Sequence, residues 1–359
     1  MNLSKALNIN IPFLTRVSSK EKALIARQLA TMLSSGLDVA QAFKILASQT
    51  RSSFMRTSFQ AVILDLEQGN SLSFALARQD KVFDPVFIAI VRSGESSGKL
   101  DQVLDQLAER LEESQDFNSK VKSALYYPIF VVITMIVIVI LMLIYVIPQL
   151  KTVFEENDFQ VPWTTQFIIN LSSFMVNYWW LVIIILLILT MVLFIFLRTK
   201  EGGSVWDGLK IKIPLIKDLY MLLYMSRFCR TMSMMLASGI PIMETMAITA
   251  DVIQNRVYTK SLKNAAMQVE RGIPMSVPLQ KDKNFPPIVS QMILVGEQTG
   301  KMNVTLSKLA EYYEKETESK VKGLAALIEP ILILFMGCGV GFLAFSIIWP
   351  IYSFAQKGF

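Results

Sequence analysis

The chain has 359 residues, 53% of them hydrophobic, and its 35 basic and 29 acidic side chains give a net charge of +6. Its mean hydropathy of +0.45 is too high for an ordinary soluble domain, and disordered chains are polar and highly charged. The sequence has no histidine and two cysteines, Cys229 and Cys338, which excludes histidine-based catalysis, a disulfide scaffold and a cysteine cluster for a metal. We therefore expect a membrane protein that is not an enzyme and holds no cofactor or metal.

Three apolar runs are long enough to cross a bilayer, which needs about 20 apolar residues. The first contains no charged residue, and the second begins with the aromatic cluster Tyr178–Trp180, which is typical of a membrane interface. The third contains Glu329 and Pro330 near its start. The apolar segment Ile9–Leu14 is too short for a signal peptide. The predicted spans are residues 126–147, 178–197 and 324–352.

Basic residues beside the spans predict the orientation of the chain. Lysines and arginines precede the first span, follow the second and precede the third, whereas the segment behind the first span carries Lys151 against three acidic residues. By the positive-inside rule, residues 1–125 and 198–323 are cytoplasmic, and residues 148–177 and 353–359 form an external loop and an external C-terminus. Both cytoplasmic parts have mixed charge without a basic block, so we expect contact with the lipid bilayer and no binding of nucleic acid.

The chain contains an internal repeat. RQLATMLSSG (Arg27–Gly36) matches RTMSMMLASG (Arg230–Gly239), and FDPVFIAIVRSGESSGKL (Phe83–Leu100) matches FPPIVSQMILVGEQTGKM (Phe285–Met302). The offset between the copies is 202 to 203 residues. The repeat continues to the membrane, because Pro128 and Pro330 align. The sequence therefore predicts two homologous domains, each followed by its own span.

Each copy is predicted to be helical. After the second matched segment, apolar residues recur at helical spacing in both copies, whereas strand patterns are scarce outside the spans. Gly36 and Gly239 end such helical stripes, which favours a left-handed cap before the next helix. We expect an all-α membrane protein with two homologous cytoplasmic helical-bundle domains of about six short helices each and three transmembrane helices. The domains are residues 18–125 and 198–323, preceded by a short lead at 1–17.

The matched segments GESSGKL and GEQTGKM have some likeness to a phosphate-binding loop. That loop requires four residues between its glycines and Ser or Thr after the lysine. Both copies have three residues between the glycines and an apolar residue after the lysine, so we expect a helix–turn–helix joint instead. The last glycine would supply the turn, and the glutamate would offer either a cap or a partner contact, which the sequence leaves open. The residues concerned are Gly94, Glu95 and Gly98 in the first copy and Gly296, Glu297 and Gly300 in the second.

Glu329 is the one acidic residue of the third predicted span. An ionisable group within a membrane is costly and is a candidate for function. Because it lies about five residues inside the span, its role is either structural anchoring or a coupling or proton-handling function. Gly337 and Gly341 have the spacing that lets membrane helices approach each other closely.

From Val17 to Tyr352 the chain resembles the type II secretion F / type IV pilus inner-membrane platform protein family. The first copy carries RQLATMLSSGLDVAQAF, GESSGKL and ALYYPIF, and the second carries LASGIPIMETM, GEQTGKM and LIEPILI. The run VPWTT in the predicted external loop fits as well. About 17 residues precede the first domain, fewer than in many relatives.

The resemblance implies an assembly role in the bacterial inner membrane rather than a reaction. Its implied partners are a cytoplasmic hexameric ATPase, prepilin or pseudopilin subunits, other inner-membrane assembly proteins and further copies of the chain. Two alternatives remain at this point: a small multi-pass transporter or permease subunit, and a membrane-bound enzyme. Transporters usually repeat their spans around a midplane site, whereas this repeat is mainly outside the spans.

Overall fold

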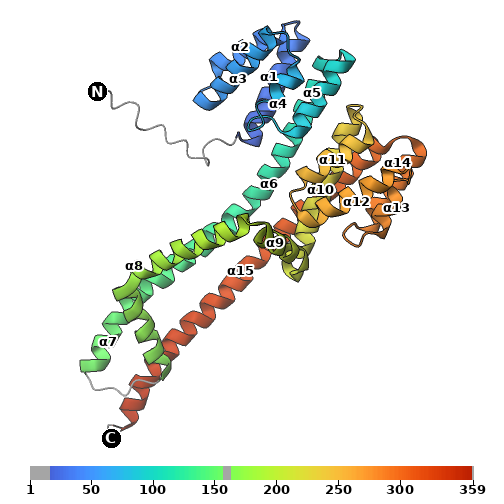
Figure 1. Ribbon diagram of the computed structural model, residues 1–359. Helices are drawn as coiled ribbons and strands as arrows, with labels where there is room; N and C mark the ends of the chain where they lie inside the picture. Colours follow the sequence, from blue (N-terminus) through green and yellow to red (C-terminus); the bar gives the residue numbers. More distant parts are fainter. Residues whose placement is uncertain (1–16, 157–162, 358–359) are drawn as a thin grey trace, which may run out of the picture. The chain divides into compact units, whose positions relative to one another are not determined.

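The computed structural model describes residues 17–156 and 163–357, and all regular structure in these ranges is helical (Figure 1). The chain forms two compact units. The helical unit contains residues up to 120 together with residues 210–317, and the membrane unit contains residues 121–209 and those from 318 onward. The all-α class expected from the sequence is confirmed. The predicted lead lies, apart from residue 17, outside the described residues.

The first bundle of the helical unit is built from α1 to α6, and its helices begin at side chains that cap free N–H groups. The Ser18 hydroxyl accepts from the N–H of Glu21, and Glu21 in turn accepts from the N–H of Ser18, which is a capping box. Asp38 and Asp84 cap α2 and α5. The helices are α1 (Ser19–Ser34), α2 (Val39–Gln49), α3 (Ser53–Glu67), α4 (Leu72–Ala77), α5 (Pro85–Ser97) and α6 (Leu100–Leu141).

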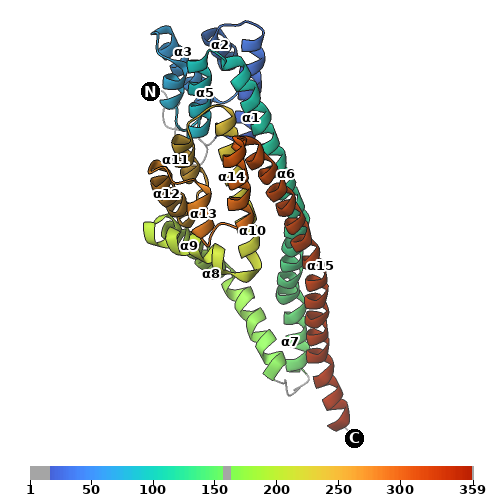
Figure 2. The same cartoon turned by 90° about the vertical axis from the view of Figure 1, so that its right-hand side faces the viewer.

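The second bundle repeats this order, and Figure 2 shows its helices beside those of the first. The two bundles touch where α5 meets α10. With the N-terminal part of α15, the second bundle has six helices in the described chain, as the sequence predicts. They are α10 (Pro214–Ala237), α11 (Ile242–Val252), α12 (Arg256–Glu270), α13 (Ser276–Lys281), α14 (Pro287–Thr299) and α15 (Met302–Lys357), and α9 (Lys200–Lys212) precedes them.

Aromatic side chains fill the centre of both bundles. In the first, the rings of Phe43 and Phe59 meet edge to face with centroids 5.7 Å apart. In the second, the ring of Phe285 meets those of Phe228 and Tyr258 at 5.4 and 5.6 Å. All five residues are buried, and burying one such side chain stabilises a fold by about 1.5–3 kcal/mol.

Gly36 and Gly239 end α1 and α10 with left-handed backbone, at φ +86° and +75°. The N–H of the residue that follows each glycine bonds back to a helix carbonyl: Leu37 to Met32, and Ile240 to the residue equivalent to Met32. This is the glycine-ended cap that the sequence predicts at both places.

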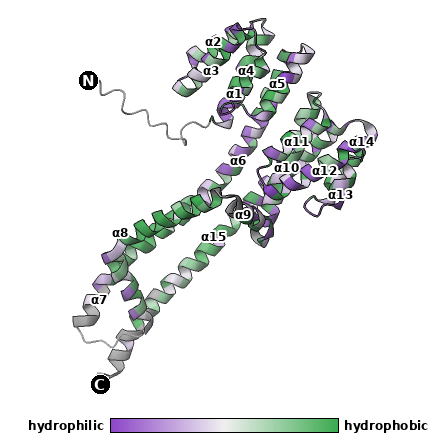
Figure 3. Cartoon of the chain, viewed as in Figure 1, coloured by the Kyte–Doolittle hydropathy of each residue, from purple (hydrophilic) through white to green (hydrophobic). Residues whose placement is uncertain are grey.

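The helices of the membrane unit are strongly apolar (Figure 3). Three helices of the described chain are long and apolar enough to cross a membrane: α6, α15 and α8 (Trp163–Arg198). The first and third predicted spans are not separate helices, because α6 and α15 continue without a break from the bundles into the apolar segments. The predicted start of the second span, Tyr178, is a kink in α8, with φ −125° and ψ 21°.

The segment predicted as the external loop is largely helical where it is described. A π-helical turn (Met142–Val146) leads into α7 (Ile147–Glu156), and the first part of α8 packs against both. In this turn the N–H of Ile147 bonds to the carbonyl of Met142. The carbonyl of Leu143 would next receive the N–H of residue 148, but Pro148 has none. The buried Ser172 hydroxyl of α8 donates to that carbonyl instead, at 2.5 Å.

Ser172→Ala is therefore expected to destabilise the packing of α8 on the π-helical turn by about 1–3 kcal/mol, because it leaves the Leu143 carbonyl without a donor. Hydrogen exchange in detergent should show faster exchange for residues 163–177 than in the wild type. Thr190→Ala is the matched control, since the Thr190 hydroxyl bonds to a carbonyl of its own helix, that of Leu187. Equal exchange in Ser172→Ala and Thr190→Ala would contradict the assignment.

Candidate functional site

The joints between α5 and α6 and between α14 and α15 place Glu95 and Glu297 in equivalent positions. The carboxylate of Glu95 accepts from the N–H of Leu72 at 2.6 Å, and from the N–H and hydroxyl of Ser73 at 3.2 and 2.7 Å. Leu72 and Ser73 form the first turn of α4. Glu95 thus holds the N-terminus of a helix 22 residues earlier in the chain, where a negative charge is favourable.

Glu297 makes the same three contacts in the second bundle. Its carboxylate accepts from the N–H of Met275 at 2.5 Å, and from the N–H and hydroxyl of Ser276 at 3.4 and 2.5 Å, at the start of α13. Both glutamates are half-buried. Of the two roles that the sequence leaves open, the intramolecular contact is present in both copies.

The glycines beside these glutamates allow the tight joint. Gly98 and Gly300 have φ of +67° and +68° and end α5 and α14. A Cβ at Gly296 would lie 2.5 Å from the Thr305 hydroxyl oxygen, and one at Gly94 would lie 3.0 Å from the Cβ of Val103. The neighbouring helix therefore passes close to the backbone in both copies.

The backbone of these segments does not form a phosphate cradle. The N–H of Lys99 donates to the Gly94 carbonyl at 2.9 Å, and the N–H of Lys301 donates to the Gly296 carbonyl at 3.1 Å. In a phosphate loop such N–H groups face the ligand. Among the described residues there is also no group of three or more histidine, cysteine, aspartate or glutamate residues that could hold a metal ion.

An arginine–glutamate pair that was not predicted from the sequence connects the first and last helices of each bundle. Arg27 of α1 donates two parallel hydrogen bonds to Glu112 of α6, both at 2.8 Å, and a third to Asp105 at 2.5 Å. In the second bundle Arg230 of α10 donates to Glu314 of α15 at 2.9 and 2.6 Å. The signal was available, because the arginines lie at the same position of the repeat and the glutamates are 202 residues apart.

The two pairs differ in burial. The side chains of Arg27 and Glu112 are 36% and 45% exposed, whereas those of Arg230 and Glu314 are 10% and 15% exposed. The hydrogen bond from Arg27 holds the pKa of Glu112 below its usual value. For Arg230, burial alone would lower the pKa, but the hydrogen bond and charge of Glu314 outweigh it and the pKa is raised. Both arginines are therefore permanently charged.

Cys229, next to Arg230, is buried, and burial raises the pKa of its thiol. A buried, protonated thiol is a poor nucleophile, so this residue packs the core.

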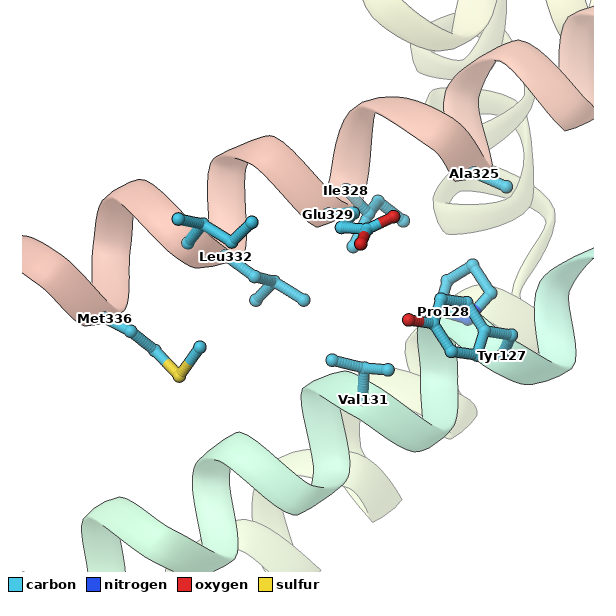
Figure 4. A pocket seen from close by; sticks show the side chains of 9 residues that line it. Tyr127, Pro128, Val131, Ala325, Ile328, Glu329, Leu332 and Met336 are labelled. Carbon is cyan, nitrogen blue, oxygen red and sulfur yellow. The ribbon is translucent and has the colours of Figure 1, made fainter.

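In the membrane unit, a hollow of about 170 Å³ lies between α6 and α15 (Figure 4). Tyr127 and Pro128 of α6 face Glu329 of α15 across it, and the Tyr127 hydroxyl and the Glu329 carboxylate both point into the hollow. Tyr127 and Glu329 occupy the same position of the repeat, as do Pro128 and Pro330. The carboxylate is exposed and has no hydrogen bond or ion pair to the residues that the structure describes. Apolar side chains complete the lining: Val131, Ala325, Ile328, Leu332, Ile333 and Met336.

The residues predicted from the sequence therefore do not form one site but lie at several separate sites. Each joint holds its own two glycines and its glutamate, and the two joints belong to different bundles. Pro128 and Glu329 meet at the hollow, whereas the glycine caps of α1 and α10 lie in the bundles.

The family model of the type II secretion system (T2SS) protein F matches residues 25–148 and again residues 228–350. The chain belongs to this family. Each match contains most of one bundle together with the apolar helix that leaves it, so the repeating unit is a bundle plus a span. Residues 149–227, which contain most of α7, all of α8 and α9 and the first part of α10, lie between the matches.

Similar proteins are named for two related machines. The chain is 34% identical to the type IV pilus assembly protein PilC of Thermus thermophilus, over 96% of this chain and 85% of the relative. It is 33% identical to PilC of Myxococcus xanthus over 97% and 84%, and 32% identical to type II secretion system protein F of Aeromonas hydrophila over 93% and 86%. The resemblance predicted from the sequence is confirmed. With three apolar helices, these similarities support a place in the inner membrane.

Proposed function

We propose that this protein is the inner-membrane platform of a type IV pilus or type II secretion machine, and that it couples a cytoplasmic hexameric ATPase to the assembly of pilin or pseudopilin subunits. The names of the relatives support the machine, and the continuity of α6 and α15 supports the coupling. Residues 17–125 and 198–323 would lie in the cytoplasm, with residues 148–177 and the C-terminus outside, in agreement with the basic residues beside the spans.

The coupling follows from where each long helix is anchored. Leu104 and Leu107 of α6 are buried in the core of the first bundle, and Leu306 and Leu309 of α15 are buried in that of the second. The same helices continue into the apolar spans without a break. A bundle that is displaced by a partner therefore has to displace its span, because an unbroken α-helix transmits translation and rotation along its axis.

A proline lies near the start of the apolar segment of α6 and of α15. Pro128 and Pro330 lack an N–H, so the helix loses one backbone hydrogen bond at the same position of both copies. Such a position bends more readily than the rest of the helix. On this proposal the two prolines are joints about which the apolar segments of α6 and α15 tilt when their bundles move.

A pair of insertions after Lys120 tests the coupling. Four glycines would replace the stiff connection in α6 by a flexible one, whereas four alanines keep the helix and rotate the span by only about 40°. We expect the glycine insertion to abolish filament or secretion activity in the native host and the alanine insertion to retain most of it. Both variants should still be found in the membrane fraction.

Crosslinking in the same cells separates the two parts of the proposal. Capture of a hexameric secretion-type ATPase and a pilin-like subunit by both variants, with activity lost only in the glycine variant, is the expected result. Normal activity of the glycine variant would contradict mechanical coupling through α6. Capture of neither partner by the wild-type protein would contradict the platform function itself.

A further inference from the structure

The two bundles contact each other through unlike surfaces. In the first bundle the contact comes from α5, and in the second it comes from the turn between α10 and α11. The Ser93 hydroxyl of α5 donates to the carbonyl of Ser238 at 2.5 Å, and Arg92 pairs with Glu244 at 3.4 Å. Met235 of α10 packs into the hydrophobic core of the first bundle. The contact is therefore head to tail.

Because the bundles are repeats, each has both kinds of surface, and one of each kind is left uncovered within a single chain. The uncovered equivalent of the α5 surface is the α14 face, which we define by Ile288, Leu294 and Val295. The uncovered equivalent of the α10–α11 turn is the α1–α2 turn, which we define by Met32, Ser35 and Leu37.

Burial differs between the copies as this arrangement requires. Ala89 of α5 is buried, but its equivalent in α14, Gln291, is exposed. Met235 is fully buried, but its equivalent in α1, Met32, is only half-buried. Equivalent residues of the two bundles thus differ in burial where one of them is covered by the other bundle within the chain and its counterpart is not.

The α14 face is apolar where the covered surface is polar. Leu294 stands in the place of Arg92 and is 43% exposed, and Val295 stands in the place of Ser93 and is 46% exposed. Ile288, about two helical turns before Val295, is 42% exposed. These side chains lie outside the apolar spans, and grouped exposed apolar residues on such a surface mark an interaction site.

We propose that the α14 face is covered by the α1–α2 turn of a second copy of this chain, in the geometry of the α5 contact. A second copy is the occupant because this chain already contains one such contact between homologous bundles, and the α1–α2 turn is the uncovered counterpart. Two reciprocal contacts of this kind would close a dimer as a ring of four bundles. The proposal is independent of the proposed function.

The polar contacts of the α5 surface do not carry over, because Leu294 and Val295 stand in the places of Arg92 and Ser93. Within the chain, Arg230 also donates to Glu113 of the first bundle at 3.0 Å, but the residue equivalent to Glu113 is Lys315. The residue equivalent to Arg230 is Arg27, which already donates to Asp105 in its own bundle. The contact between copies therefore rests on apolar side chains, and it brings Lys315 near Arg27, whose charge is already neutralised by Glu112 and Asp105.

Cysteine crosslinking of the full-length chain in native membranes tests the interface. In a Cys338→Ala background, Ser35→Cys with Val295→Cys places thiols at the positions equivalent to Ser238 and Ser93. We expect a disulfide-linked dimer, and no such dimer from either cysteine alone. Ser93→Cys with Ser238→Cys is the matched control, which should crosslink within one chain without a change of mass. An intrachain bond in the control and only monomer from the test pair would overturn the proposal.

A charge on the α14 face provides a second test. Adding Leu294→Glu to the test pair should lower the yield of dimer by about tenfold or more, because burying an unpaired carboxylate costs more than the 1.4 kcal/mol that a tenfold change requires. Gln298→Glu, an exposed position of the same helix, should leave the yield unchanged. An unchanged yield with Leu294→Glu would overturn the proposal, as would crosslinking of Val295→Cys to a different protein in place of a second copy.

Discussion

Arg230→Ala is expected to destabilise the second bundle by about 3–5 kcal/mol, which is the usual effect of removing one partner from a buried ion pair. The side chain of Arg230 is 10% exposed and neutralises Glu314, itself 15% exposed. It also pairs with Glu113 of the first bundle. Without the guanidinium, two neighbouring carboxylates lose their shared partner, and one of them has little access to water.

Arg27→Ala is the matched control. Arg27 makes the equivalent pair with Glu112, but both side chains are well solvated, so the expected loss is about 1 kcal/mol or less. Thermal unfolding of the full-length protein in detergent should show a Tm lower by about 10 °C for Arg230→Ala and by a few degrees at most for Arg27→Ala. Equal shifts would mean that burial does not set the strength of these pairs.

Glu297→Lys is expected to destabilise the second bundle by about 3 kcal/mol, since hydrogen bonds to a charged group are each worth about 1.5–3 kcal/mol. The carboxylate accepts from the N–H of Met275 and from both donors of Ser276. A lysine would leave these donors unpaired and would place a positive charge at the N-terminus of α13, where the helix dipole disfavours it.

Two further variants separate a helix cap from a partner contact at this position. Ser276→Ala removes one donor of the same network without changing the surface charge and should lower the Tm in the same direction by a smaller amount. Glu316→Lys makes the same charge change at an exposed position of α15 and should leave the Tm unchanged. A Glu297→Lys protein with wild-type Tm that fails to capture the ATPase would show instead that the glutamate is a docking residue.

Most of the features that could be predicted from the sequence depend on local residue patterns and on the internal repeat. The glycine caps after α1 and α10, the joints at Gly98 and Gly300 and the three apolar runs each depend on residues close together in the chain, and an internal repeat doubles every such signal. The roles of Glu95 and Glu297 could not be decided in this way, because their partners lie more than 20 residues away and only folding brings them together.

It was harder to predict where a helix ends than to predict that a helix is present. The change from charged to apolar sequence near residue 125 marks a change in the polarity of the residues of α6. It does not mark the end of the helix, which continues to Leu141. Pro128 did not end the helix either, since one missing N–H costs a single hydrogen bond that many neighbouring turns can outweigh. Residues 148–177 were interpreted as an external loop because they lie between two apolar runs long enough to cross a membrane, although most of α7 and the first part of α8 lie there.

The residues between the two family matches determine whether the number of membrane crossings between the bundles is odd or even. A repeating unit with one crossing has its two ends on opposite faces of a bilayer, so two such units joined directly would present their bundles to different compartments. The single extra crossing that α8 can supply makes the number between the bundles even. Gene duplication could therefore yield two bundles able to touch through α5 and α10 only if this unduplicated helix was present between them.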